Sequence, residues 1–557
     1  MNLAPLARFA WVGGAWGLLW LGSPGVLADG GSPILAIAAL VAWGLGASRP
    51  GKKAFLVEWL AAALGLSAIC WWSTLVVEIA LVGVALVPAV YMALAGVLLR
   101  RLVRSVPLAL ALPLAWVALE TLRCWVEPPL GFGWLRIGHD FSTIPWLAGS
   151  ARVWGVLGLS VAAAGAAGAI ADKLSERLRM TGARDAAIGG GQAARAWIAR
   201  ALATGPLALA PVLSLATSPP PMAKGPRLLL VQPAFEQHRK MAGLDTGPDL
   251  IALTRKGLAA AQGVDLVCWG ETLWPSFLDA GSHAGELHPP PWMQEPDVRA
   301  LEADEAQEVG QGVFGHGLVP PDCSFLAGAV LFVAHAGEVR RANGAVLWGP
   351  GGKRLGVGFK QHLVPGGETM AGLERWKWVR DAAFALAGYI PDFVAADETG
   401  VVELPWKGGP PVHLGLSICF DNTYDDPYTS PLRKGPLDAH VVLSNEAWYG
   451  ESCEYDHMLA FSRLAAIESG RAIARVTNSG VTALFGADGS ELARLRVGGK
   501  DRMVGGTLLV DLPIPAAGHS ADQTLYVRVE PGLRWLAILA PLVLLLLWRP
   551  RPVTPQA

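Results

Sequence analysis

The sequence predicts a multi-pass α-helical membrane domain joined to an α/β domain with two packed sheets. The 557 residues are 52% apolar and only 16% charged, whereas an average protein carries about 25% charged residues. Apolar runs of the length that a bilayer requires, about 20 helical residues, crowd residues 1–220 and return near the C-terminus. Residues 227–515 instead have the composition of a soluble domain, in which strand-like runs alternate with Ala-rich helical stretches.

Seven membrane spans are predicted before residue 220, and an eighth follows the soluble domain. They cover roughly residues 5–27, 32–49, 54–73, 75–99, 106–126, 150–172, 197–217 and 532–548. Strongly basic loops follow the second, fourth, sixth and eighth spans. Because basic loops favour the cytoplasm, we predict that both termini are cytoplasmic. The large segment after the seventh span then lies outside, in the periplasm or its equivalent.

The loop after the fifth span carries an ionisable pair, Glu120 and Arg123, followed by a Gly- and Trp-rich stretch at residues 128–139. Two interpretations remain open for it. The pair could snorkel to water as a membrane anchor, which is common at helix ends. Alternatively, the loop could help line a lipid access site at the membrane surface.

The soluble domain begins after a Pro-rich linker at residues 218–226. Strands are predicted at residues 227–232, 264–269, 324–334, 345–348, 412–419, 439–444, 471–476 and 482–485, and helices at about 247–262 and 456–470. Residues 281–322 are polar, acidic and Pro-rich, so we expect an inserted loop outside the core. Residues 370–400 are rich in aromatic residues and resemble a lid or a membrane-touching segment.

Composition also excludes some classes of function. The net charge is −1, so nucleic acid is not an expected partner. Six Cys residues lack CxxC spacing, and therefore neither a zinc site nor a disulfide framework is indicated. No His-rich spacing suggests a metal, and we expect no cofactor. No Gly-x-Ser-x-Gly motif points to a serine hydrolase.

Three residues at the ends of predicted strands supply the groups that acyl transfer through a thioester requires. Residues 414–421 read Leu-Gly-Leu-Ser-Ile-Cys-Phe-Asp, an apolar run that stops at Cys419. Taken singly, Cys419 could be a core residue, and Glu271 and Lys360 could be surface charges. Taken together, Glu271 can remove the thiol proton, and Lys360 can lower the thiol pKa and hold the oxyanion.

These motifs resemble those of the apolipoprotein N-acyltransferases, a membrane family within the nitrilase superfamily. Glu271, Lys360 and Cys419 are similar in order and context to the superfamily's Glu-Lys-Cys triad. Residues 360–368, Lys-Gln-His-Leu-Val-Pro-Gly-Gly-Glu, resemble the family's Lys-x-His-Leu-Val-Pro-Phe-Gly-Glu. Residues 444–450, Ser-Asn-Glu-Ala-Trp-Tyr-Gly, resemble Ser-Asn-Asp-Ala-Trp-Phe-Gly, and residues 475–483 resemble Arg-x-Thr-Asn-x-Gly-Val-Thr-Ala.

The resemblance implies a nitrilase-like αββα sandwich and a two-step reaction. Cys419 would take an acyl chain from a membrane phospholipid, and the α-amine of an S-diacylglyceryl-cysteine at a lipoprotein N-terminus would then receive it. A thioester allows this attack provided that water is kept away. The resemblance also implies supporting or substrate-binding roles for Glu368, Phe420, Asp421, Asn445, Trp448 and Tyr449.

Departures from the family pattern keep alternatives open. Phe420-Asp421 replaces the usual Tyr-Glu, Gly270 replaces a Pro, and Gly366 replaces a Phe. One alternative is a membrane-tethered amidase or nitrilase-like hydrolase, in which water attacks the same thioester. Another is a non-catalytic relative. Cys453 is a weaker candidate nucleophile, and it could instead pair with Cys323 in an oxidising compartment.

Overall fold

The computed structural model describes residues 4–76, 80–126, 130–180, 190–237, 247–274, 278–279, 305, 308–388 and 390–547. The chain divides into two compact units. One unit comprises Met1–Thr74, Glu78–Ser218 and Arg528–Ala557. The other comprises Leu75–Val77 and Pro219–Val527.

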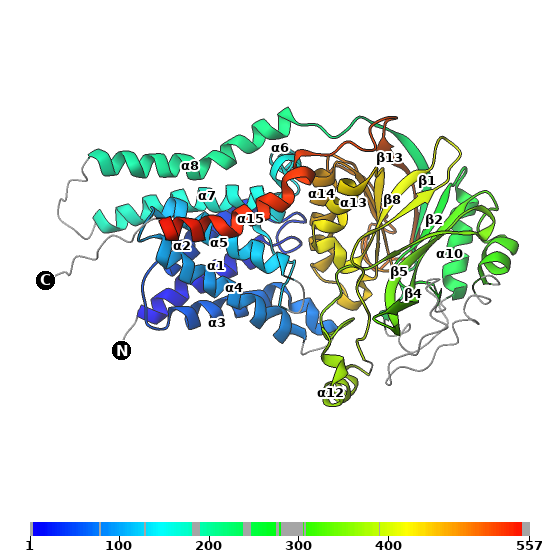
Figure 1. Ribbon diagram of the computed structural model, residues 1–557, viewed down its shortest axis with the longest axis horizontal. Helices are drawn as coiled ribbons and strands as arrows, with labels where there is room; N and C mark the ends of the chain where they lie inside the picture. Colours follow the sequence, from blue (N-terminus) through cyan, green and yellow to red (C-terminus); the bar gives the residue numbers. More distant parts are fainter. Residues whose placement is uncertain are drawn as a thin grey trace. The chain divides into compact units, whose positions relative to one another are not determined.

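The first unit is built from apolar helices (Figure 1). Each predicted span corresponds to one helix: α1 (Ala4–Gly22), α2 (Pro33–Ala47), α3 (Ala54–Ile69), α4 (Ala80–Leu102), α5 (Leu108–Trp125), α7 (Ala151–Met180), α8 (Gly190–Ala216) and α15 (Leu525–Leu547). A short helix, α6 (Pro145–Ala148), precedes α7. Among the described residues, five helices are long and apolar enough to cross a membrane, in α4, α5, α7, α8 and α15. Several membrane helices were therefore predicted correctly.

Glu120 and Arg123 do not snorkel, since each is only 2% exposed. Arg123 donates hydrogen bonds to the carbonyl oxygens of Phe132 and Leu135, both at 2.8 Å, and to that of Trp134. Oε2 of Glu120 accepts the backbone N–H of Ile137 at 3.1 Å. The two side chains thus hold the Gly- and Trp-rich loop in place. Their hydrogen bonds satisfy backbone groups of the loop that have no access to water.

The second unit contains two mixed β-sheets. The first has the order β13-β1-β2-β4-β5-β6, with β3 paired to β4. Its strands are β1 (Met222–Gln232), β2 (Leu266–Trp269), β3 (Leu278–Asp279), β4 (Ser324–His335), β5 (Glu338–Trp348), β6 (Arg354–Phe359) and β13 (Gly506–Pro515). The second has the order β12-β11-β10-β9-β8-β7. Its strands are β7 (Gly400–Leu404), β8 (Val412–Ile418), β9 (Ala439–Ser444), β10 (Ala472–Thr477), β11 (Ala483–Phe485) and β12 (Glu491–Arg494).

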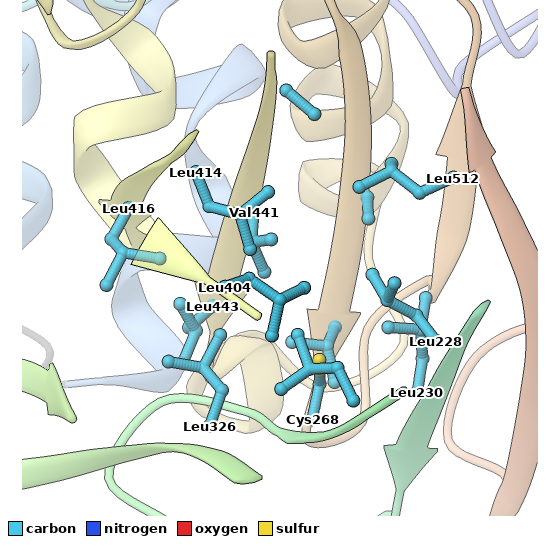
Figure 2. Packing of buried hydrophobic residues seen from close by; sticks show 14 of the residues in the cluster. Leu228, Leu230, Cys268, Leu326, Leu404, Leu414, Leu416, Val441, Leu443 and Leu512 are labelled. Atoms are coloured by element: carbon cyan, nitrogen blue, oxygen red, sulfur yellow. The ribbon is translucent and has the colours of Figure 1, made fainter. Parts of the chain in front are cut away.

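The main core lies between the two sheets. Figure 2 shows Leu228, Cys268 and Leu326 of the first sheet beside Leu414, Val441 and other apolar residues of the second. Alternation along β2 explains this placement, because Leu266 and Cys268 enter this core while their neighbours face the other side of the sheet. Side chains from both inner faces fill the space, as in other sheet-on-sheet packings.

Helices cover the outer face of each sheet (Figure 1). Helix α10 (Gly247–Ala260) packs on β1 and β13, while α13 (Asp426–Lys434) and α14 (Glu454–Ser469) pack on the second sheet. These layers form the αββα sandwich, so the predicted fold class is confirmed.

The expectation that residues 281–322 lie outside the core is wrong for its C-terminal part. The helical segment η4 (Glu308–Gly315) contributes Val309, Val313 and Phe314 to the core on the outer face of the first sheet. Glu305 also accepts a 2.8 Å hydrogen bond from the indole of Trp348. The acidic and polar composition concealed these apolar residues. Residues 281–304 lie outside the described residues.

The aromatic segment at residues 370–400 contains a surface helix, α12 (Lys377–Ala387). Its apolar side chains point outward rather than into the core: Trp378 is 70% exposed and Phe384 is 61% exposed. The segment is attached to the first sheet through Asp392, whose carboxylate accepts a 3.0 Å hydrogen bond from Arg341. It is therefore a surface element with an exposed apolar face.

Candidate active site

The three predicted triad residues follow the C-terminal ends of three strands. Glu271 lies two residues after β2, Lys360 directly follows β6, and Cys419 directly follows β8. Strands β2 and β6 run in the same direction, because β2 is parallel to β4 and two antiparallel pairings lead from β4 to β6. All three side chains line one cavity of about 450 Å³. Glu368, Asn445, Trp448 and Tyr449 line it too.

The Lys360 amine lies between two carboxylates. Its Nζ atom is 2.9 Å from the Glu368 carboxylate and 3.3 Å from Oε1 of Glu271. The side-chain amide of Asn343, on β5, also donates to both groups, at 2.7 Å to Glu271 and 2.8 Å to Glu368. Backbone N–H of Val364 completes the contacts by donating to Oε2 of Glu368 at 2.8 Å. Two acids are therefore held next to one amine with their hydrogen bonds satisfied.

The second oxygen of Glu271 faces the other sheet. Its Oε2 atom accepts the backbone N–H of Asn445 at 2.8 Å. The side chain of Asn445 is held in turn by the amide of Asn478 at 3.0 Å, and it donates to Gln237 at 3.0 Å. Since Asn445 follows β9 and Asn478 follows β10, two strand ends of the second sheet orient the Glu271 carboxylate of the first.

Cys419 occupies a strained backbone position. Its φ is +50°, in the left-handed region that non-glycine residues rarely adopt. It begins the short 3₁₀ turn η7 (Cys419–Thr423) directly after β8. Strain of this kind is common where a turn must present a functional side chain. The side chain is 5% exposed.

Burial raises the pKa of the Cys419 thiol well above its usual range, and the negative charge of Glu271 adds to this effect. Lys360 acts in the opposite direction but does not outweigh them. The expected lowering of the thiol pKa by Lys360 is therefore present, but burial and the charge of Glu271 outweigh it, and the net shift of the thiol pKa is upward. Burial lowers the pKa of Lys360, but the carboxylates of Glu271 and Glu368 outweigh burial and hold that pKa well above its usual value.

The two parts of the chain match two different models of known protein families. The apolipoprotein N-acyltransferase N-terminal domain matches residues 17–169, and the carbon-nitrogen hydrolase family matches residues 223–515. The chain belongs to the apolipoprotein N-acyltransferase family.

An apolipoprotein N-acyltransferase of Chlorobaculum tepidum is 24% identical over 69% of this chain and 68% of its own length. One of Rhizobium rhizogenes is 27% identical over 68% of this chain and 63% of its own length. One of Sinorhizobium fredii is 27% identical over 88% of this chain and 77% of its own length. The matches thus span less than two thirds of the length of some relatives.

Two residues that depart from the family pattern, Phe420 and Asp421, do not line the cavity. Phe420 packs edge-on against Tyr424 with ring centroids 5.6 Å apart. The carboxylate of Asp421 accepts backbone N–H groups of His362 at 2.8 Å and Ile418 at 3.0 Å. It therefore ties the loop after Lys360 to the strand before Cys419. Burial raises the pKa of Asp421 to about 6, although nearby His362 and the backbone hydrogen bonds act against this shift.

The other cysteines take no part in this site. Cys323 and Cys453 each carry a free thiol, so the suggested pairing between them is wrong. Burial raises the pKa of Cys453 to about 11, and the residue does not line the cavity. Among the residues that the structure describes, no group of three or more His, Cys, Asp or Glu side chains is arranged to hold a metal ion.

Sequence reasoning missed Asn343 and Gln237. Asn343 is 2% exposed and stands in an otherwise apolar stretch of β5. A buried amide needs partners, and this interruption of the apolar pattern was the available signal. Gln237 lines the cavity, but it lies in a loop whose pattern carries no such signal.

Proposed function

We propose that this protein is an apolipoprotein N-acyltransferase that uses Cys419 as nucleophile, Glu271 as general base and Lys360 as the cation. The observation that carries this proposal is the meeting of Glu271, Lys360 and Cys419 in one cavity, in a chain that also has apolar helices long enough to cross a membrane. The proposed donor is a membrane phospholipid, and the proposed acceptor is the N-terminal S-diacylglyceryl-cysteine of a lipoprotein.

In the first step Glu271 takes the proton of the Cys419 thiol as Sγ attacks an ester carbonyl of the phospholipid. The high thiol pKa requires such a base. Lys360 stabilises the negative charge that develops on the carbonyl oxygen. The ester C–O bond then breaks, Glu271 returns the proton to the leaving lysophospholipid, and the acyl chain remains on Sγ as a thioester.

In the second step the α-amine of the acceptor attacks the thioester carbonyl. Glu271 takes a proton from the amine, the C–S bond breaks, and Glu271 passes that proton to the departing sulfur of Cys419, which restores the thiol and the carboxylate. The product carries an amide in place of the free amine. Glu368 and Asn343 keep Glu271 and Lys360 in place during both steps.

The proposed orientation follows from the loop charges. Strongly basic loops follow the second, fourth, sixth and eighth spans, so both termini would be cytoplasmic. The α/β unit would then act outside the cytoplasm, at the inner membrane of a bacterial cell. Its two substrates are lipids of the same membrane, which fits an enzyme with its own membrane helices.

The test is to incubate the purified full-length protein with phospholipid and a synthetic diacylated lipopeptide, and to weigh the products. We expect the lipopeptide to gain one acyl chain while a lysophospholipid appears. A lipopeptide with an acetylated α-amine is the control and should gain none. Release of free fatty acid with no change in the lipopeptide would instead identify a hydrolase.

A further inference from the structure

A buried charged pair includes the residue that follows Asn445, which lines the cavity, but the pair itself does not line it. Glu446 begins the short turn η8 (Glu446–Tyr449), and Arg475 lies on β10. Both are 0% exposed, and Nη2 of Arg475 donates to Oε1 of Glu446. Burying two charges requires close pairing and further hydrogen bonds, so a pair in this place calls for a role.

One side of the pair leads to the base. Glu446 directly follows Asn445, whose backbone N–H donates the 2.8 Å hydrogen bond to Oε2 of Glu271. The site is shaped around the Glu446 carboxylate, since a Cβ atom at Gly480 would lie 1.6 Å from its Oε2 atom. A shift of the Glu446 side chain would therefore move the start of the turn that presents the Asn445 N–H.

The other side of the pair leads to the nucleophile. Nη1 of Arg475 donates to Oγ of Ser462 on α14 at 2.9 Å, and that hydroxyl donates to Oδ1 of Asn422 at 2.9 Å. Asn422 belongs to η7, the same turn as Cys419. Asn422 and Ser462 are buried as well. A continuous polar path thus joins the turn that bears the thiol to the turn that contacts the base.

We propose that Glu446 and Arg475 are positioning residues that hold the side chains of Cys419 and Glu271, one from each sheet, at the correct position relative to each other. This inference rests on the proposed function of Cys419 and Glu271. Since the pair does not line the cavity, its loss should slow the chemistry and leave lipid binding unchanged. A misplacement of about 1 Å between reacting groups can lower a rate by about 100-fold.

The experiment measures formation of the Cys419 thioester from phospholipid alone, by full-length protein, at several lipid concentrations. Glu446→Gln keeps the shape of the side chain and removes its charge, while Glu446→Asp keeps the charge. Ser462→Ala removes the hydroxyl between Arg475 and Asn422 and leaves the pair intact. The matched control is Glu398→Gln, which breaks an exposed ion pair with Lys434.

We expect Glu446→Gln to lower the limiting acylation rate by about 10- to 100-fold with KM changed less than about twofold. Glu446→Asp should recover most of that rate, Ser462→Ala should be slower than wild type with the same KM, and Glu398→Gln should match wild type. If Glu446→Gln does not fold, the limiting acylation rate of Ser462→Ala tests the positioning role instead.

Folded variants that acylate at the wild-type rate would overturn the positioning role. A variant with a raised KM and an unchanged limiting acylation rate would overturn it as well. A wild-type protein that forms no thioester would instead overturn the proposed function.

Discussion

The side-chain amide of Asn343 donates a 2.7 Å hydrogen bond to Oε1 of Glu271. The same amide reaches Glu368 at 2.8 Å, so one neutral group bridges two acids that share the Lys360 amine. Asn343→Ala should therefore slow thioester formation by about 10- to 100-fold, the size of a lost hydrogen bond to a charged group. Single-turnover acylation measures this, with Glu398→Gln as control. A rate within twofold of wild type would show that the bridge is dispensable.

The positive φ of Cys419 predicts an unusual order of stability. Alanine normally stabilises a protein over glycine by about 0.4–1 kcal/mol, but at φ +50° a Cβ atom costs about 1–2 kcal/mol. Cys419→Gly should therefore be at least as stable as Cys419→Ala, and we expect both variants to be inactive. Thermal unfolding of the two proteins measures the difference.

The matched control is Cys268, which lies in the regular strand β2. At this position Cys268→Ala should be more stable than Cys268→Gly. If the alanine variant is more stable than the glycine variant by the same amount at both positions, Cys419 carries no backbone strain.

The raised pKa of Asp421 predicts a pH-dependent stability. Burial raises this pKa from the usual 3.8 to about 6, so the folded protein binds the proton more tightly than the unfolded chain. The stabilisation is complete below pH 3.8 and is lost as the pH rises through 6. Between these limits wild type should lose up to about 3 kcal/mol relative to Asp421→Asn, which cannot titrate.

Thermal midpoints of both proteins between pH 4 and 7 check this. The midpoint of wild type should fall relative to that of Asp421→Asn as the pH rises. A gap that stays constant, or one that changes in the opposite sense, would argue against a buried carboxyl that titrates near pH 6.

The proposed orientation predicts the location of the C-terminus. Because Arg549 and Arg551 follow the last span, a reporter fused after Ala557 should remain in the cytoplasm. A fluorescent protein that matures only in the cytoplasm and a phosphatase that is active only outside give opposite signals. Phosphatase activity from the C-terminal fusion would refute the orientation.

The sequence was sufficient for the elements with strong apolar patterns. The predicted strands at residues 412–419 and 439–444 agree with β8 and β9 to within a residue. Strand β6 was missed because its pattern, Arg-Leu-Gly-Val-Gly-Phe, is interrupted by glycines. These glycines serve the contact with β7, since a Cβ atom at Gly356 would lie 2.7 Å from the side chain of Val402. A close approach between distant segments cannot be read from a local pattern.

The residues proposed for chemistry could be selected from the sequence, but their surroundings could not. Glu271 and Cys419 stand at the ends of strands that periodicity reveals, whereas Lys360 follows β6, which the pattern missed, and was selected by the resemblance of residues 360–368 to the family motif. The bridging amide of Asn343, the backbone strain at Cys419 and the net rise of the thiol pKa arise only when both sheets are folded. Each depends on groups far apart along the chain.

The most direct measurement of the central claim is the mass of the protein after incubation with a phospholipid and no acceptor. We predict that full-length wild type gains one acyl chain, that hydroxylamine removes it as expected for a thioester, and that peptide mapping places it on Cys419. Cys419→Ala should gain none. A hydroxylamine-sensitive acyl adduct that persists in Cys419→Ala, or a wild-type protein that never gains the acyl chain, would contradict the account.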